Sequence, residues 1–137
     1  MACDKIKTIK CIFMSNKKKI LIVEDEEPLK LTLKKKFKNE GFSVLEATNG
    51  EDGLKLTQEK KPDLILLDIV MPVMDGMTML KKLRKQDFGK EMPVILLTNL
   101  ADTSDVNKAM ELGVFDYLVK SNWEIKDVVE KVKEKLK

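Results

Sequence analysis

The sequence predicts an α/β fold in which a doubly wound, five-stranded parallel sheet carries helices on both faces. Five short apolar or β-branched runs alternate along the chain with segments whose apolar residues recur at helical spacing. Three of these runs are apolar at nearly every position, as is typical of strands buried on both faces of a parallel sheet. Five consecutive βα units then predict one sheet in the strand order 2-1-3-4-5, covered by five helices. The length of 137 residues fits one such domain.

The first unit joins a strand over residues 20–23 to an amphipathic helix. The strand is predicted from the uninterrupted run ILIV. Leu29, Leu33 and Phe37 follow at positions i, i+4 and i+8, which makes one face of the helix apolar. Gly41 comes after this pattern, where a helix often ends in a left-handed conformation that glycine adopts without steric cost.

The second and third units repeat this alternation. A strand over residues 43–46 precedes a helix over 51–60, in which leucines are spaced among charged residues. The run LILL predicts the central strand over residues 64–67, because a strand between two neighbours and two helix layers has no exposed face. A helix over residues 77–84 follows, with apolar residues three apart.

The fourth and fifth units complete the sheet. A strand over residues 94–97 leads to a helix around 106–110, after which Gly113 is a second candidate for a left-handed helix end. The last strand is expected over residues 115–119. The last helix, over 125–136, shows the clearest apolar periodicity of the chain. Ser121 and Glu124 have the spacing of a capping box for this helix, with Asn122 as the alternative cap.

The first residues of the chain differ from this pattern. Residues 1–17 are basic and lack a sustained apolar run, and a second methionine at position 14 opens the segment MSNKKKILIVEDEE. We expect them to form an extension outside the fold, disordered or added by an upstream start, although residues 9–14 could pair as an extra strand. The domain itself is expected over residues 18–137. Both cysteines fall within the extension, which favours a reducing cytoplasm.

Composition excludes several classes of function. The longest uncharged apolar runs are far too short to span a bilayer. The net charge is only +3 and Arg84 is the only arginine, which argues against nucleic-acid recognition. The chain contains no histidine, so histidine-based catalysis and histidine metal ligation are excluded. Any phosphohistidine in a reaction of this protein would have to come from a partner.

Polar residues follow four of the predicted strands. Glu24 and Asp25 come directly after the first strand, Asp68 after the third, Thr98 after the fourth and Lys120 after the fifth. Because ligands of open parallel sheets bind at the carboxyl ends of the strands, these side chains are expected to meet at one edge.

Their chemistry indicates a phosphoryl site. Three carboxylates within about 5 Å of one another repel by roughly 3 kcal/mol per pair at an effective dielectric constant of 20. A divalent cation relieves this repulsion, and carboxylate ligands suit Mg²⁺ or Mn²⁺. The Thr98 hydroxyl and the Lys120 ammonium would then stabilise a phosphoryl group attached to Asp68, the expected nucleophile at the end of the central strand.

The motifs ILIVEDEEP, DLILLDIVMPVMDG, PVILLT and FDYLVK resemble the receiver domain of bacterial two-component response regulators. The similarity covers residue 18 to the end of the chain and implies a flavodoxin-like receiver fold. It implies that Asp68 is the phosphoacceptor. It also implies that Glu24, Asp25, Asp68 and the backbone carbonyl of Val70 bind Mg²⁺ or Mn²⁺.

By the same resemblance, Thr98 and Lys120 bind the phosphoryl group, and Thr98 and Tyr117 form a switch. Two positions depart from the family pattern: Ser121 follows the lysine where proline is common, and Asn99 replaces a small residue. We expect Val70, Asn99 and Leu100 to modulate hydrolysis, because neither apolar side chain can hold a water molecule and Asn99 adds bulk beside the phosphoryl group.

The resemblance therefore predicts a stand-alone, chemotaxis-regulator-like receiver rather than an enzyme that acts on an external substrate. It would take its phosphoryl group from a sensor histidine kinase or a histidine phosphotransfer protein in a Mg²⁺-dependent reaction. A downstream protein would bind the face formed by the fourth helix, the fifth strand and the fifth helix. No DNA-binding domain is expected after the last helix, and no membrane contact.

Three other interpretations remain open at this point. A hydrolase of the aspartyl-phosphate type typically needs a second aspartate where this chain has Val70. A flavin- or nucleotide-binding protein of the same architecture needs an anion cradle after the first strand, where residues 24–27 are all acidic. A receiver that works through protein contacts without phosphorylation would be insensitive to substitution of Asp68.

Overall fold

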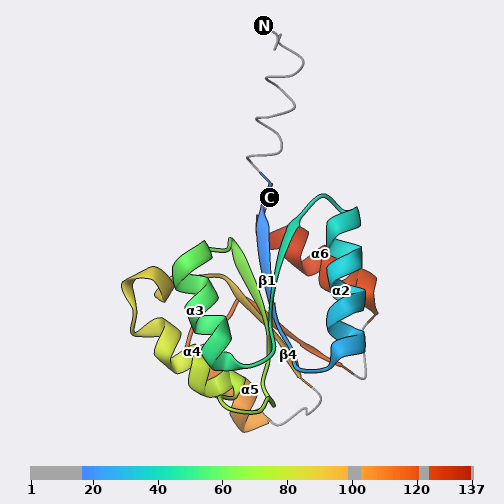
Figure 1. The fold of residues 1–137 in the computed structure, drawn as a ribbon. Coiled ribbons are helices and arrows are strands. Elements are labelled where there is room, and N and C mark those ends of the chain that lie inside the picture. The colour runs from blue at the N-terminus through green and yellow to red at the C-terminus, as the bar shows by residue number, and fades with distance from the viewer. Residues whose placement is uncertain (1–16, 99–102, 121–123, 137) are drawn as a thin grey trace, which may run out of the picture.

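The computed structural model describes residues 17–98, 103–120 and 124–136. The described strands form one parallel sheet in the order β2-β1-β3-β4-β5, as the sequence predicts. The expected α/β fold class is confirmed, and Figure 1 shows helices on both sides of the sheet. Residues 1–16 of the expected N-terminal extension lie outside the described part of the chain.

The five strands lie close to their predicted positions. Strand β5 begins at Asp116, one residue later than expected, because residue 115 lies in a bend. Strands β2, β3 and β4 each extend one residue past their predicted end, and β1 begins one residue earlier than predicted. The strands are β1 (Lys19–Val23), β2 (Ser43–Ala47), β3 (Leu64–Asp68), β4 (Val94–Thr98) and β5 (Asp116–Val119).

The helices also follow the predicted alternation. The described α-helices are α2 (Glu27–Asn39), α3 (Gly50–Lys60), α4 (Gly76–Arg84), α5 (Thr103–Glu111) and α6 (Ile125–Leu136). A short 3₁₀ helix, η2 (Asp87–Gly89), was not predicted. Asn49 caps α3 by accepting a hydrogen bond from the backbone N–H of Asp52, so a polar side chain fixes the start of that helix.

Two predicted helix ends can be compared with the structure. Gly41 and Gly113 have φ values of 96° and 79°, the left-handed conformation expected for both. At the start of α6, the Asp127 carboxylate accepts a hydrogen bond from the N–H of Glu124. The predicted capping pair is therefore corrected: Glu124 is the residue before the helix, and the capping acid is Asp127. Residues 121–123 are outside the described part of the chain.

Two apolar layers separate the sheet from its helices. Helices α2 and α6 cover one face, where Leu33, Phe37 and Val128 are fully buried. Helices α3, α4 and α5 cover the other, where Met79 and Leu80 are fully buried (Figure 1). Every residue of β3 and β4 is buried, as the uninterrupted apolar runs predict. None of the described helices has the length and apolarity needed to cross a membrane.

Arg84 joins three segments at the end of α4. Its guanidinium donates hydrogen bonds to the carbonyl oxygens of Leu112 and Gly113, in the turn after α5. It also donates to the carbonyl oxygens of Gly89 and Met92, on the path from η2 to β4. Burial lowers the pKa of Arg84. The planar guanidinium can reach both segments at once because its donors point in several fixed directions.

We expect Arg84→Met to lower the free energy of unfolding by about 2–4 kcal/mol, because it leaves several carbonyl groups without their charged donor. Urea denaturation of the wild type and the variant measures this difference in the free energy of unfolding. Arg84→Lys should recover part of the loss, since one ammonium can serve one of the two segments. An unchanged urea midpoint in the methionine variant would show that water replaces the guanidinium at no cost.

Candidate functional site

Three carboxylates meet at the carboxyl ends of β1 and β3. Oxygen atoms of Glu24, Asp25 and Asp68 all lie within 4.8 Å of one another. Glu24 is fully buried and Asp68 is 3% exposed, whereas Asp25 is exposed. The sequence predicts this meeting because Glu24 directly follows β1 and Asp68 ends the adjacent β3. Two nearly buried acids beside a third create a strongly negative site.

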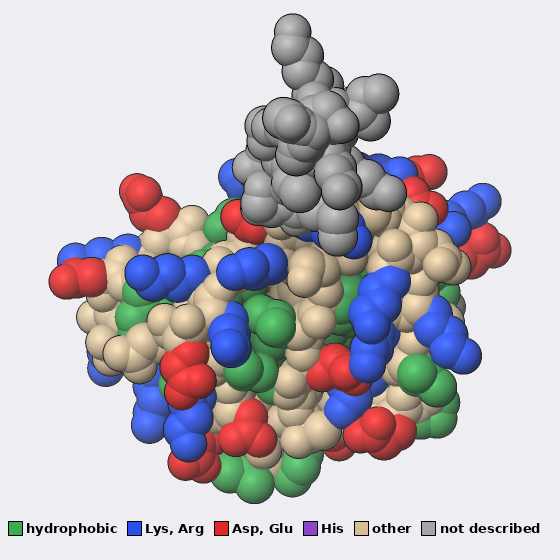
Figure 2. Space-filling model, turned by 45° about the horizontal axis from the view of Figure 1, so that its top comes forward, with side chains coloured by type: hydrophobic (Ala, Val, Ile, Leu, Met, Phe, Trp, Pro, Cys, Tyr) green, Lys and Arg blue, Asp and Glu red, His purple; other side chains and the backbone are tan. Residues whose placement is uncertain are grey.

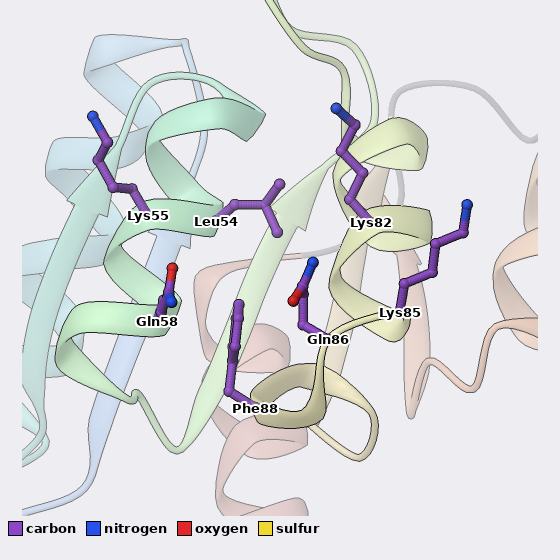
Figure 3. Close-up of a pocket in the computed structure, with 7 residues that line it drawn as sticks. All are labelled: Leu54, Lys55, Gln58, Lys82, Lys85, Gln86 and Phe88. Atoms are coloured by element: carbon purple, nitrogen blue, oxygen red, sulfur yellow. The ribbon is translucent and has the colours of Figure 1, made fainter.

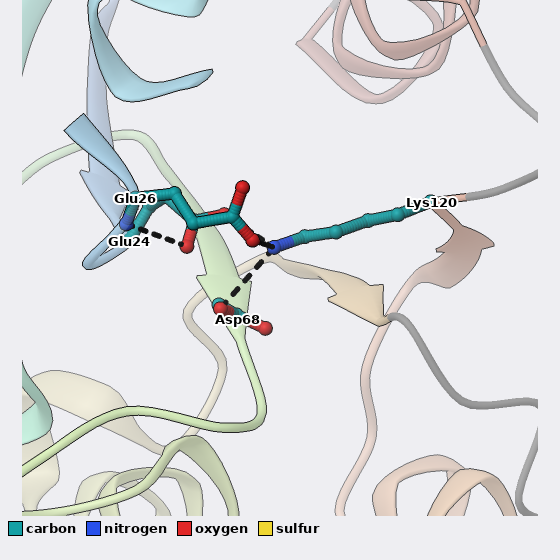
Figure 4. Close-up of polar contacts among 4 residues, drawn as sticks. All are labelled: Glu24, Glu26, Asp68 and Lys120. Atoms are coloured by element: carbon teal, nitrogen blue, oxygen red, sulfur yellow. Dashed lines mark hydrogen bonds and ion pairs between the residues drawn. The ribbon is translucent and has the colours of Figure 1, made fainter. Parts of the chain in front are cut away.

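Lys120 inserts its ammonium into this cluster from the end of β5 (Figure 4). Its Nζ atom lies 2.6 Å from Oε1 of Glu24 and 3.2 Å from Oδ2 of Asp68. The lysine side chain is only 8% exposed. The parallel strands β3, β4 and β5 therefore bring together a nucleophile candidate and a cation that are 52 residues apart in the sequence.

Glu26 is a residue whose contact the sequence does not predict. An acid just before a helix ordinarily favours the positive end of that helix. The Oε1 atom of Glu26 instead lies 3.4 Å from Nζ of Lys120, and its side chain makes no capping hydrogen bond to α2 (Figure 4). The acidic run over residues 24–27 indicates that some acids lie near the end of β1. It does not indicate which of their side chains turns toward Lys120.

The pKa values of Glu24 and Lys120 are both raised, although burial acts on the two groups in opposite directions. Burial raises the pKa of Glu24, and its contact with Asp68 raises it further. Burial alone would lower the pKa of Lys120, but the Glu24 and Asp68 carboxylates outweigh burial and raise it. Lys120 therefore stays charged, while Glu24 holds a proton more readily than an exposed glutamate would.

Thr98 and Tyr117 lie on adjacent strands, on one face of the sheet. In the register of β4 and β5, Tyr117 is opposite Leu96, and Thr98 is two residues further along the same strand as Leu96. Since side chains alternate along a strand, Thr98 and Tyr117 point toward the same face, the one covered by α5. Thr98 is 2% exposed and Tyr117 is 39% exposed, so the pair extends from the buried site to the surface.

The loop after β3 folds tightly around the end of that strand. The N–H of Gly76 donates to the carbonyl oxygen of Ile69 at 2.8 Å and closes the loop. Val70 and Val73 are 61% and 77% exposed, and Val73 has a φ of 66°. A β-branched residue in the left-handed region is strained. The loop thus presents two apolar side chains to solvent beside Asp68.

Other predicted site residues can be placed only in part. Asn99, Leu100 and Ser121 are outside the described part of the chain. Val70 is exposed and lies two residues after Asp68 in the sequence, and its effect on hydrolysis stays a prediction. The described residues thus bring together Glu24, Asp25, Asp68 and Lys120, with Thr98 at the end of the neighbouring strand.

The donor set fits a hard divalent cation. Glu24, Asp25 and Asp68 each offer a carboxylate oxygen, and the described residues around them include no sulfur or nitrogen ligand. Mg²⁺ and Mn²⁺ prefer such oxygen ligands. A cation held by these acids and the Lys120 ammonium would both place positive charge near the Asp68 carboxylate. This arrangement stabilises an anionic group attached to that carboxylate.

Comparison of this sequence with known protein families identifies one match. Residues 20–133 match the family described as the response regulator receiver domain. A transcriptional regulatory protein of Streptomyces coelicolor, AfsQ1, is 40% identical over 101 residues, which are 74% of this chain and 44% of that protein. The alkaline phosphatase synthesis transcriptional regulatory protein PhoP of Bacillus subtilis is 39% identical over 75% of this chain and 42% of its own length. The chain thus spans less than half the length of these curated relatives.

Comparison with solved structures agrees with the family found by sequence. A CheY-like response regulator receiver domain protein from Methanospirillum hungatei superposes with a TM-score of 0.82 at 30% identity, over 88% of this chain and 94% of that one. The chemotaxis protein CheY4 of Vibrio cholerae has a TM-score of 0.80 at 24% identity, over 86% of this chain and 98% of that one, and shares the fold. The chain belongs to the response regulator receiver domain family, whose members are signalling phosphoacceptors of two-component systems.

Proposed function

We propose that Asp68 accepts a phosphoryl group from a phosphohistidine of a sensor histidine kinase or a histidine phosphotransfer protein. The observation that carries this proposal is the position of its carboxylate. It lies at the end of the central strand β3, 3.2 Å from the Lys120 ammonium and beside two further acids. The chain itself contains no histidine, so the donor is a partner's side chain.

In the proposed reaction, a carboxylate oxygen of Asp68 attacks the phosphorus of the partner's phosphohistidine. An oxygen–phosphorus bond forms, the nitrogen–phosphorus bond breaks, and its electron pair stays on the departing imidazole. Lys120 holds a phosphoryl oxygen through its ammonium, and the Thr98 hydroxyl donates to another. These residues stabilise charge that is spread over the phosphoryl oxygens.

We propose that Glu24, Asp25, Asp68 and the backbone carbonyl of Val70 hold Mg²⁺ or Mn²⁺. When bound there, the cation supplies positive charge against the phosphoryl oxygens. The meeting of three carboxylate oxygens within 4.8 Å supports this ligand set. Lys120 alone cannot neutralise three acids and an incoming phosphoryl group, so phosphorylation is expected to require the divalent cation.

Incubation with acetyl phosphate and Mg²⁺, followed by intact mass measurement, tests this function. We expect one added phosphoryl group per chain, and none in excess chelator. No adduct in the presence of Mg²⁺ would overturn the proposal. Steady release of phosphate from added phosphoesters, without a covalent adduct, would instead support the hydrolase interpretation.

The pKa of Glu24 predicts how cation affinity depends on pH. Burial raises this pKa above the usual value of 4.5. A cation must displace any proton held by its ligands, so the affinity for Mg²⁺ should fall progressively as the pH is lowered from neutral, starting at a higher pH than it would for an unshifted glutamate. Calorimetry in buffers of different ionisation enthalpy measures the protons released. Glu24→Gln should bind more weakly and show a smaller dependence on pH; a wild-type affinity that is constant as the pH is lowered would contradict the prediction.

We propose that phosphorylation changes the affinity of one surface for a downstream protein. The surface is formed by α5, β5 and α6, and the proposed switch residues Thr98 and Tyr117 connect it to Asp68. Their common face and the partial exposure of Tyr117 support this path. A hydrogen bond from Thr98 to the phosphoryl group would let Tyr117 move inward and alter that surface.

We assign residues 18–137 to this switching unit and residues 1–17 to an extension outside it. The family match begins at residue 20, one residue after β1 starts. A stand-alone receiver of the chemotaxis-regulator type stays a prediction, because the curated relatives are more than twice as long as the span that this chain matches. We also propose a cytoplasmic location, because the proposed reaction requires contact with a histidine kinase or a phosphotransfer protein.

We propose that Val70, Asn99 and Leu100 slow the loss of the phosphoryl group. Val70 is 61% exposed, lies two residues after Asp68 in the sequence, and cannot orient an attacking water molecule. Val70→Asn should therefore accelerate dephosphorylation by up to about tenfold, because the amide can orient the attacking water through one hydrogen bond worth about 1 kcal/mol. Time-resolved mass measurement checks the rate. Val73→Asn, an equal substitution at an exposed position of the same loop, is the control; equal rates in both variants and the wild type would contradict this role.

A further inference from the structure

A groove of about 440 Å³ lies between α3 and α4, outside the carboxylate site (Figure 3). The 3₁₀ helix η2 adds Phe88 to its wall. None of the residues that line it belongs to the phosphoacceptor site or to the proposed output surface on α5, β5 and α6. The groove therefore has no part in the function proposed above.

The floor of this groove is apolar. Leu54 from α3 and Phe88 from η2 point into the space between the helices (Figure 3). Both are half-buried and pack against the core layer beneath α3 and α4. Each side chain thus has one side fixed by the core and another side open to the groove. An apolar group placed between them would be removed from water without any rearrangement of the core.

The rim of the groove is cationic. Lys55 on one side and Lys82 and Lys85 on the other are exposed, and among the described residues none of the three takes part in an ion pair. No carboxylate lines the groove. The nearby acid of η2, Asp87, lies 3.3 Å from Lys90 and pairs with it.

The lining of the groove differs in charge from the surface as a whole. Figure 2 shows basic and acidic side chains interspersed over the face that it draws, whereas the groove is lined by three lysines and no acid. The whole chain has a net charge of only +3, so three unpaired lysines around one groove are a concentration of charge. Charges arranged in this way attract and orient a partner of opposite sign more than they add affinity.

We propose that this groove docks an acidic segment of a partner protein, with one apolar side chain between Leu54 and Phe88 and carboxylates against the lysines. The rim also carries Gln58 and Gln86, whose amides can both donate to and accept from a peptide backbone. Residues 1–16 of this chain are an unsuitable occupant because they are basic. Nucleic acid is disfavoured because the rim offers no arginine and only two half-buried apolar groups for stacking.

A partner bound in this groove would leave both the phosphoacceptor site and the proposed output surface accessible. The groove shares no residue with the carboxylate cluster or with α5, β5 and α6. A partner held there can remain bound while a second protein reads the output surface. The groove would then bring the receiver close to a fixed partner, and phosphorylation would decide what else is bound.

Titration of the full ¹⁵N-labelled chain with a synthetic peptide tests the proposal. The probe has one phenylalanine flanked on both sides by glutamates. We expect saturable chemical-shift changes centred on Leu54, Gln86 and Phe88. A second peptide with serine in place of phenylalanine should bind more weakly, because it leaves the apolar floor uncovered. Shifts spread over all exposed lysines, or equal affinity for both peptides, would overturn the proposal.

Charge reversal separates a local site from general attraction. Lys82→Glu combined with Lys85→Glu should weaken binding of the phenylalanine peptide by about tenfold, because two attractive charges become repulsive. Lys82→Arg combined with Lys85→Arg should retain it. The matched control is Lys35→Glu with Lys38→Glu, two exposed positions on α2 that change net charge equally. An equal loss in this control would overturn the proposal.

Two further measurements exclude other occupants. Groove shifts that depend on protein concentration without peptide would assign the groove to a second copy of this chain, and binding of a single-stranded oligonucleotide with equal affinity would assign it to nucleic acid. Either result overturns the acidic-segment proposal. Phosphorylation of every variant by acetyl phosphate is expected to equal that of the wild type, which keeps this test independent of the phosphoacceptor assignment.

Discussion

Asp68→Asn is expected to abolish phosphorylation by acetyl phosphate while leaving the fold intact. An amide is a poor nucleophile because its lone pairs are delocalised and it carries no charge, and it is also a weaker ligand for Mg²⁺ than a carboxylate. The substitution keeps the shape of the side chain. It also removes one of the acids that repel each other at this site, so we expect no loss of stability from it.

Intact mass and peptide mapping measure this effect. The wild type should carry its phosphoryl group on the peptide that contains Asp68, and the variant should carry none. The matched control is Asp87→Asn, which changes a fully exposed acid on η2. This variant should carry the same amount of phosphoryl group as the wild type. An adduct that persists on the Asp68→Asn protein would sink the assignment of the phosphoacceptor. Wild-type biological activity in that variant would favour a receiver that works without phosphorylation.

Gly76→Ala is expected to have the largest effect on the fold near the site. A Cβ atom at this position would lie 2.1 Å from the carbonyl oxygen of Asp68 and 2.9 Å from the Cα atom of Ile69. Both neighbours are backbone atoms, so no side chain can rotate to make room. Either β3 and α4 must separate or the loop must open, and we expect a loss of roughly 3–5 kcal/mol in the free energy of unfolding.

Gly41→Ala distinguishes this close approach from the ordinary cost of replacing glycine. Gly41 has a φ of 96°, but no atom lies within 4 Å of a Cβ built there. Its replacement should cost only about 1 kcal/mol through backbone strain. Urea denaturation compares the two variants. Gly76→Ala should in addition slow phosphorylation, since it displaces the end of β3, whereas Gly41→Ala should not; equal effects of both substitutions would contradict this account.

The sequence alone determined the sheet and the composition of its polar edge. The apolar runs of β3 and β4 predicted buried central strands, and the alternation of strands and helices predicted the strand order. Asp68 and Lys120 could be expected to meet because each follows a strand and parallel strands end at a common edge. These predictions succeed because periodicity and strand order are properties of the backbone, which a short pattern of residue types specifies.

Only the tertiary structure decided which long side chains make contact. Glu26 and Glu27 are adjacent in sequence, yet Glu26 turns toward Lys120 while Glu27 pairs with the buried Lys30. Arg84 bonds to carbonyl groups that no residue pattern identifies, and the groove between α3 and α4 exists because η2 places Phe88 beside Leu54. Such contacts depend on loop paths and side-chain rotamers, which are fixed by packing between distant segments and leave no periodic signal in the sequence.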